Sequence, residues 1–170
     1  TKLRNKIAYD EAVVKNTEED FIIFISKYPR TLEANLAKED LWRVAFENAS
    51  KINTIESYTN FINKYFDATQ VKIAQNKIEN IAWAKIEKLD SIELFVEYID
   101  KYPNSEKNDV AKIKIENLTW AKTKLENKLI DYKEFINNFP DSKYIKEASD
   151  SLGSKSWAAI ANSMDLKDFI

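Results

Sequence analysis

Hydrophobic residues recur at helical spacing in four similar segments of this chain. In the third segment the apolar residues are Ile92, Phe95, Tyr98, Ile99 and Tyr102. They fall at i, i+3, i+6, i+7 and i+10, which is the stripe of an amphipathic helix and not the alternation of a strand. The related segments are residues 21–29, 58–66, 95–103 and 132–140. The pattern therefore predicts four short helices of about 12 residues each.

These segments are copies of one unit, because equivalent residues lie 37 positions apart. The last aromatic residues of the segments are Tyr28, Tyr65, Tyr102 and Phe139. The same step relates Ala37, Ala74, Ala111 and Ala148, then Leu41, Ile78, Ile115 and Leu152, then Phe46, Trp83, Trp120 and Trp157. A second, longer helix of about 20 residues is predicted between successive short ones. An internal repeat of this length is typical of a stacked helical array.

Polar residues and prolines predict where the helices begin and end. Thr17, Thr54 and Ser91 precede the short helices and are expected to cap their free amides, while Asn127 is expected to replace Lys128 in the fourth copy. Prolines are expected to stop the short helices at Pro29, Pro103 and Pro140. N-caps of the longer helices are predicted at Thr31, Ser105 and Ser142, with Asp67 serving in the second copy.

The ends of the sequence fall inside repeat units. Thr1 has the phase of Lys38 in a long helix, and Ile170 has the phase of Lys133 in a short one. A complete array is expected to carry polar terminal units. The interpretation is a single helical-repeat domain over residues 1–170 that is a piece of a longer array or multidomain protein.

The aromatic–proline spacing of eight in residues 21–29, 95–103 and 132–140, with the small residues Ala37, Ala74, Ala111 and Ala148, resembles the tetratricopeptide repeat family in a long, divergent bacterial form. On that phase the short helix is the family's second helix and the long helix its first. The resemblance implies an all-α, right-handed αα-solenoid of about four helix-turn-helix repeats plus partial terminal units. It also implies binding to other proteins.

Composition removes several classes of function. The chain has no Cys and no His, and its one glycine is Gly153, so thiol chemistry, the commonest general base and a glycine-rich phosphate loop are missing. No carboxylate pair is set apart from the others as acid and base. We therefore expect no enzyme, no cofactor and no metal. The formal charge of −2 gives no reason to expect nucleic acid, and there is no apolar run near 18 residues that would span a membrane. Cytoplasm and periplasm both remain open as locations.

The tryptophans are expected to belong mainly to the core. Trp83, Trp120 and Trp157 share one repeat position, which favours packing between neighbouring units. Trp42 lies outside that position, one turn before Phe46, and is expected to pack against Phe46. A partner-facing role for Trp42 is the alternative. Acidic residues on the polar sides of the short helices are interpreted as a solvated face, with an acidic strip for a basic peptide as the alternative.

The surface residues that stand out are Ile23, Leu94 and Ile130, which are apolar but outside the repeated core positions. We expect them, with Trp42 as a further candidate, to contact a protein or peptide partner. The leading hypothesis is a non-enzymatic scaffold or protein–protein interaction module. The rivals are a structural spacer or stalk in a larger bacterial protein, and a carbohydrate or cell-wall binding module that uses exposed aromatic residues.

Overall fold

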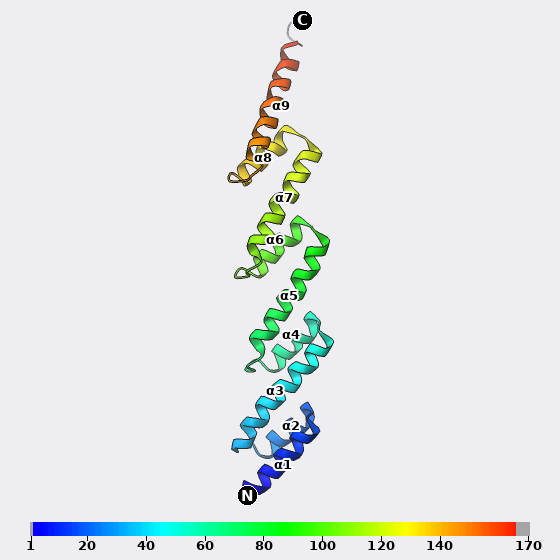
Figure 1. Cartoon of the computed structure of the whole chain (residues 1–170), viewed down its shortest axis with the longest axis vertical. Coiled ribbons are helices and arrows are strands. Elements are labelled where there is room, and N and C mark those ends of the chain that lie inside the picture. The colour runs from blue at the N-terminus through cyan, green and yellow to red at the C-terminus, as the bar shows by residue number, and fades with distance from the viewer. Residues whose placement is uncertain (1, 166–170) are drawn as a thin grey trace. The chain divides into compact units, whose positions relative to one another are not determined.

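The computed structural model describes residues 2–165, and within them it contains nine α-helices and no strand (Figure 1). The prediction of an all-α protein is thus confirmed for this part of the chain. Thr1 and Ile170, from which a longer parent protein was inferred, lie outside the described residues. Long helices alternate with short ones. The long helices are α1 (Lys2–Lys15), α3 (Leu32–Ile52), α5 (Val71–Leu89), α7 (Asn108–Glu126) and α9 (Ile145–Asp165).

The short helices are nearly identical in length and spacing. They are α2 (Glu18–Lys27), α4 (Ile55–Lys64), α6 (Ile92–Lys101) and α8 (Leu129–Asn138). Each has 10 residues, slightly fewer than expected, and each begins 37 residues after the one before it. Their first two buried aromatic residues lie three positions apart, as Tyr58 and Phe61 do in α4. That spacing places both rings on one face of the helix.

The short helices end at an aromatic residue, with or without a proline after it. The C-cap residues are Tyr28, Tyr65, Tyr102 and Phe139, with φ between −126° and −132°. Each donates its N–H to the carbonyl four residues earlier at 2.9 Å. Tyr65 is followed by Phe66, yet it has the same conformation as the three residues that precede proline. Proline is therefore not required to end the helix, and the prediction assigned it too large a role.

The N-caps of three short helices agree with prediction. The Thr17 hydroxyl accepts the Asp20 N–H, Thr54 forms a reciprocal capping box with Ser57, and Ser91 accepts the Leu94 N–H. In α8 the N-cap is Lys128, which makes no side-chain cap bond. The expectation that Asn127 would serve there was wrong, because Asn127 is the C-cap of α7 in the left-handed conformation.

A set of left-handed residues connects each of the first four long helices to the short helix after it. Asn16, Asn53, Asp90 and Asn127 have φ between 48° and 53°. Asn and Asp adopt this conformation more readily than other residues with a Cβ, and they commonly end helices. These residues are 37 positions apart, so the repeat spacing itself could have identified them.

The predicted N-caps of the long helices were only partly right. Thr31 caps α3 by accepting the Ala34 N–H. The hydroxyls of Ser105 and Ser142 instead accept the N–H groups two residues on, within a turn that precedes α7 and α9. No cap bond from Asp67 to α5 is described, and the Asp67 carboxylate pairs with Lys38 at 3.9 Å. The helices begin later than expected because these copies first form a turn of successive i to i+3 hydrogen bonds.

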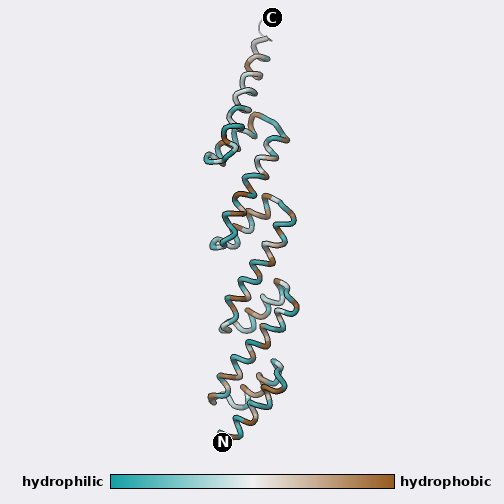
Figure 2. Tube along the Cα trace, viewed as in Figure 1, coloured by the Kyte–Doolittle hydropathy of each residue, from teal (hydrophilic) through white to brown (hydrophobic). Residues whose placement is uncertain are grey.

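The chain divides into two compact units, residues 1–85 and 86–170, with the division inside α5. Figure 2 shows hydrophobic and hydrophilic residues interleaved along the helices of each unit. In the first unit, Phe21 and Phe24 of α2 pack with α1 and α3, and Phe61 of α4 packs with α3. In the second unit, Phe135 of α8 packs with Trp120 and Ala148 of the flanking long helices.

The core prediction for the tryptophans holds for two of the three. Trp83 and Trp120 are buried, but the Trp157 residue is 75% exposed. Trp120 is covered by Tyr132 and Phe135 of α8, which lie 12 and 15 positions after it. The position 12 residues after Trp157 is Phe169, which lies outside the described residues. The expectation that Trp157 is a core residue was therefore wrong for the described structure, because nothing described covers it.

Candidate functional site

Each unit contains a groove between a long helix and the short helix that follows it. The α3–α4 groove, with a volume of about 220 Å³, takes Ala45, Asn48, Ala49 and Ile52 from α3. From α4 it takes Ser57, Asn60, Phe61 and Lys64, and Glu18 and Tyr65 complete its rim. The buried Ala45, Ala49 and Phe61 form an apolar floor. This arrangement resembles a small ligand pocket, which is mostly apolar with a few polar groups at its edge.

The α7–α8 groove in the second unit has a volume of about 190 Å³ and is built from the same repeat positions. It takes Thr119, Lys122, Thr123 and Glu126 from α7. From α8 it takes Asp131, Glu134, Phe135 and Asn138. Each of these eight residues lies 74 positions, or two repeats, after a residue of the α3–α4 groove. The two grooves have a phenylalanine at the same floor position, Phe61 and Phe135, whereas the side chains of their rims differ in polarity and charge.

Charge is the main difference between the two grooves. The α3–α4 groove has one lysine and one glutamate, Lys64 and Glu18, which are 3.0 Å apart. The α7–α8 groove has the three acids Glu126, Asp131 and Glu134 against Lys122. Glu126 is already paired with Lys128 at 2.6 Å. The first groove is therefore locally neutral, and the second has a net negative charge.

Glu18 fastens the rim of the α3–α4 groove by joining three helices. Its carboxylate accepts hydrogen bonds from the Tyr65 hydroxyl at 2.7 Å, from Lys64 at 3.0 Å and from the Asn48 amide at 3.1 Å. Burial alone would raise the pKa of Glu18, but these hydrogen bonds outweigh it and lower the pKa. Glu18 is therefore held as an anion that fixes the positions of the groove's polar side chains.

Asp131 occupies the position that Ser57 has in the first unit, with a different outcome. The Ser57 hydroxyl donates to the Ala49 carbonyl at 2.9 Å and accepts the Thr54 N–H at 3.1 Å. A carboxylate has no proton to donate to the equivalent carbonyl. The Oδ2 atom of Asp131 is buried and has no hydrogen-bond partner within the part of the chain that is described. An unpaired buried acceptor of this kind is destabilising.

The residues predicted to bind a partner lie in different environments. Ile23 and Ile130 are exposed, and Leu94 is half-buried. Ile23 and Leu94 share repeat positions with Asn60 and Ser57 of the α3–α4 groove, whereas Ile130 belongs to a position that lines neither groove. None of the three lines either groove, so their contact with a partner stays a prediction.

Trp42 lies in the core of the first unit, which favours the packing interpretation over a partner-facing one. It is buried with Ala45, Ala49, Tyr58 and Phe61, and Phe46 packs against the same cluster. The Lys38 ammonium lies 4.7 Å from the centre of its ring, a cation–π distance.

An exposed apolar position recurs on the long helices α3, α5 and α7. Leu36 of α3, Ile73 of α5 and Val110 of α7 share one repeat position and are each 47–49% exposed. The sequence analysis did not single them out, although the 37-residue step that relates them is visible in the sequence.

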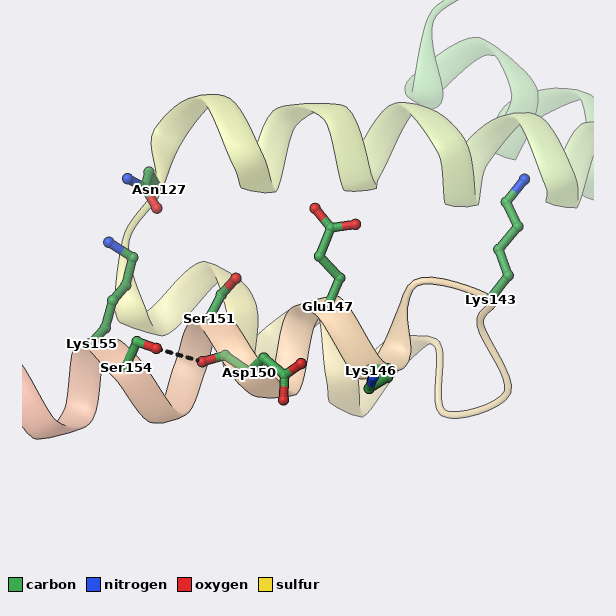
Figure 3. A pocket seen from close by; sticks show the side chains of 8 residues that line it. All are labelled: Asn127, Lys143, Lys146, Glu147, Asp150, Ser151, Ser154 and Lys155. Carbon is green, nitrogen blue, oxygen red and sulfur yellow. Dashed lines mark hydrogen bonds between the residues drawn. The ribbon is translucent and has the colours of Figure 1, made fainter.

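The largest pocket described lies beside α9 and is lined by polar and charged residues (Figure 3). It has a volume of about 580 Å³ and includes Lys143, Lys146, Lys155, Glu147 and Asp150. Figure 3 shows Asn127 and Lys155 together at one end and Lys143 at the other. The hydrogen bond drawn there joins the Ser154 hydroxyl to the Asp150 carbonyl at 3.0 Å. None of its side chains is buried, so we do not assign it a ligand.

Residues 2–165 contain no group of three or more acidic, His or Cys side chains arranged to hold a metal ion. Among the helices described, none is both long and apolar enough to cross a membrane. A scan of protein-family models and a search of curated proteins find no match to this chain.

Proposed function

We propose that this chain is a non-enzymatic protein-interaction scaffold, built as a right-handed αα-solenoid of 37-residue units similar to tetratricopeptide repeats. Its partners are proteins or peptides whose side chains enter the grooves between each long helix and the next short helix. The observation that carries this proposal is the pair of grooves at equivalent positions with unlike charge.

A repeated frame with a variable lining is the property that a binding scaffold needs. The frame is supplied by buried aromatic residues, with Phe61 and Phe135 at the same place in the two grooves. Exposed rim residues such as Asn60 and Glu134 can differ between the grooves without disturbing that frame. The α3–α4 groove suits an apolar or uncharged side chain. The α7–α8 groove suits the ammonium or guanidinium group of a basic side chain, because opposite charges at an interface favour the correct partner.

The test uses tryptophan substitutions that fill each groove. Asn60→Trp blocks the α3–α4 groove, and Glu134→Trp blocks the α7–α8 groove. The matched controls are Asn63→Trp and Asn137→Trp, which are exposed positions on the same helices and outside both grooves. Peptides that bind the unmodified chain are selected from a random library displayed on phage. Their affinities are then measured against all four variants.

The proposal expects binders that weaken at least about tenfold with a groove variant and are unchanged by its control, the size of effect that a blocked contact centre produces. Binders lost with Glu134→Trp are expected to be basic. If every selected peptide binds the groove variants and the controls equally, the grooves are not binding sites. A spacer role would then be favoured, whereas turnover of a substrate by the purified chain would contradict the scaffold proposal itself.

A further inference from the structure

Asp131 of the α7–α8 groove has a counterpart in the first unit that shows what an aspartate at this repeat position binds. Asp20 of α2 lies three repeats before Asp131, and each is the third residue of its short helix. The Asp20 carboxylate accepts a hydrogen bond from the Lys15 ammonium at 2.9 Å and one from the Thr17 hydroxyl at 2.6 Å. The hydrogen bonds from Thr17 and Lys15 lower the pKa of Asp20, so the first unit itself supplies the partners of this anion.

Both of these donors are replaced at the equivalent positions beside Asp131. Glu126 stands where the first unit has Lys15, and Lys128 stands where it has Thr17. The Lys128 ammonium is bonded to Glu126 at 2.6 Å, and no ion pair of Asp131 is described within residues 2–165. The α7–α8 groove therefore keeps the acceptor, loses the ammonium that pairs with it in the first unit and gains a second carboxylate in its place.

A buried hydroxyl in the same groove also lacks a partner. Thr123 is 4% exposed and lines the groove, whereas the equivalent residues of the first unit are Ala12 and Ala49. No hydrogen bond of the Thr123 hydroxyl is described within residues 2–165. Buried polar groups without a partner are uncommon in folded proteins because they cost free energy. Two groups of this groove, Asp131 and Thr123, are therefore open to hydrogen bonds from an incoming polar group.

The burial of one oxygen of Asp131 favours one kind of cation. A guanidinium group gains its advantage over an ammonium by bonding both oxygens of a carboxylate. The Oδ2 atom of Asp131 is buried, so only Oδ1 is open to a ligand. In the first unit the Lys15 ammonium likewise binds Oδ1 of Asp20 alone. An ammonium has three donors that it can share among nearby oxygens, which suits a groove also lined by Thr123 and Glu134.

We propose that the α7–α8 groove is a receptor for a lysine side chain of a partner protein, whose ammonium takes the place beside Asp131 that Lys15 takes beside Asp20. This inference rests on the proposed scaffold function and narrows it, because that function allows any basic side chain in this groove. Asp131 is the residue that selects lysine, and the Thr123 hydroxyl is a further acceptor. The carboxylate that has no cation in the free chain gains one when the lysine is bound.

The experiment uses the full chain and three peptide libraries displayed on phage. The libraries have the same random positions and differ only in a fixed central residue, which is Lys, Arg or Gln. Peptides are selected on the unmodified chain, and those that lose affinity with Glu134→Trp are kept, because they occupy the α7–α8 groove. The affinities of the synthetic peptides are measured by fluorescence anisotropy.

We expect the lysine library to give binders that depend on the groove, and replacement of their central Lys by Arg to weaken binding at least about threefold. Asp131→Asn removes the charge of the carboxylate with little change in shape. It should weaken binding of the lysine peptide at least about tenfold and leave binding of the same peptide with Lys→Gln nearly unchanged. A purely structural role of Asp131 would not produce that difference between the two peptides.

A second variant fills the site from within the chain. Glu126→Lys puts an ammonium at the repeat position of Lys15, where it can pair with Asp131, and should abolish binding of the lysine peptide. Asp109→Lys changes the net charge by the same amount at an exposed position of α7 outside the groove, and should leave binding nearly unchanged. Circular dichroism verifies that each variant is folded.

Three results would overturn the inference. They are a lysine library without groove-dependent binders, an arginine peptide that binds as tightly as its lysine version, and an equal effect of Asp131→Asn on the lysine and glutamine peptides. If peptides of any library still lose affinity with Glu134→Trp and keep it with Asn137→Trp, the scaffold function stands and only the choice of lysine is wrong. If no peptide distinguishes the groove variants from their controls, the scaffold proposal fails as well.

Discussion

Trp120 and Trp157 offer a direct test of how burial at one repeat position contributes to stability. Both are replaced by Ala in otherwise unmodified chains. Trp120 contacts Tyr132, Phe135 and Tyr144, and its ring stacks on Tyr144 with the planes 14° apart. No aromatic contact is described for Trp157, which is largely exposed. We expect Trp120→Ala to be strongly destabilising and Trp157→Ala to be nearly neutral.

The magnitude follows from two opposing terms at Trp120. Truncation of a buried Trp to Ala typically costs about 3–5 kcal/mol. The indole N–H of Trp120 is buried without a partner among the described residues, so its removal returns part of that cost. An unpaired buried donor costs about 1–3 kcal/mol, which leaves a net loss of about 2 kcal/mol, the midpoint of a range of about 0–4, in the free energy of unfolding. An exposed substitution such as Trp157→Ala changes that free energy by about 0.5 kcal/mol at most.

A third variant separates the ring from its N–H group. Trp120→Phe keeps an aromatic ring against α8 and removes the unpaired donor, and the first unit already has Phe46 at this repeat position. We expect this change to cost about 1 kcal/mol or less, since the lost ring volume and the removed N–H act in opposite directions.

Urea denaturation followed by far-ultraviolet circular dichroism measures all three variants without relying on tryptophan fluorescence. With an m value of about 1–3 kcal/mol/M, the midpoint for Trp120→Ala should fall by roughly 1 M or more. The midpoint for Trp157→Ala should stay close to that of the unmodified chain. Equal midpoints for the two alanine variants would refute the reasoning, because the repeat position would then be equally important with and without a covering helix.

Three further predictions concern single polar groups. Hydrogen bonding lowers the pKa of Glu18 in the folded chain below its ordinary value of 4.5. The unmodified protein should therefore have a higher free energy of unfolding than Glu18→Gln above pH 4.5, and this difference should shrink as the pH falls further. Urea melts of both proteins at each pH measure it. Burial and a hydrogen bond to Asp40 raise the pKa of Tyr9 from 10.0 to about 12. The free energy of unfolding, measured by urea melts, should therefore fall as the pH rises between those values, and it should fall less in Tyr9→Phe. An equal dependence of this free energy on pH in the two proteins would contradict the prediction. Asp131→Ser should raise the free energy of unfolding by about 1 kcal/mol, and with it the thermal midpoint, because a hydroxyl can donate where the carboxylate cannot. A lower thermal midpoint would show that the favourable interaction of Asp131 with the helix dipole is larger.

The positions of the short helices were predictable because two periodic signals, the helical spacing of apolar residues and the 37-residue repeat, indicate the same segments. The apolar stripe that ends at Tyr102 gives the helical period, and the 37-residue step gives three more examples of the same stripe. Local errors in one copy are corrected by the others. The capping residues Thr17, Thr54 and Ser91 were right for the same reason, since a hydroxyl immediately before the stripe can reach the first-turn amides.

The failures occurred where equivalent residues have different neighbours. Thr31 and Ser105 share a repeat position, but Thr31 accepts an N–H three residues on and Ser105 accepts one two residues on. A hydroxyl bonds readily in either geometry, so the sequence alone does not decide between a helix cap and a turn. The prediction that Trp157 is buried was wrong for a different reason, which involves residues distant in the sequence. Its burial depends on what lies against α9, whereas the repeat pattern reports only what its counterparts contact.

The grooves could not be predicted from the 37-residue repeat, because most of the residues that line them differ from one copy to the next. A search for conserved repeat positions finds Phe61 and Phe135, which form the floors and are the same in both units. The rim is a set of positions at which the copies disagree, and disagreement alone cannot distinguish a binding residue from neutral variation. The structure adds the missing constraint by showing that seven such positions, together with the shared phenylalanine, enclose one space in each unit. Substituting the rim at Asn60 or Glu134 therefore tests function, whereas substituting the floor tests only the fold.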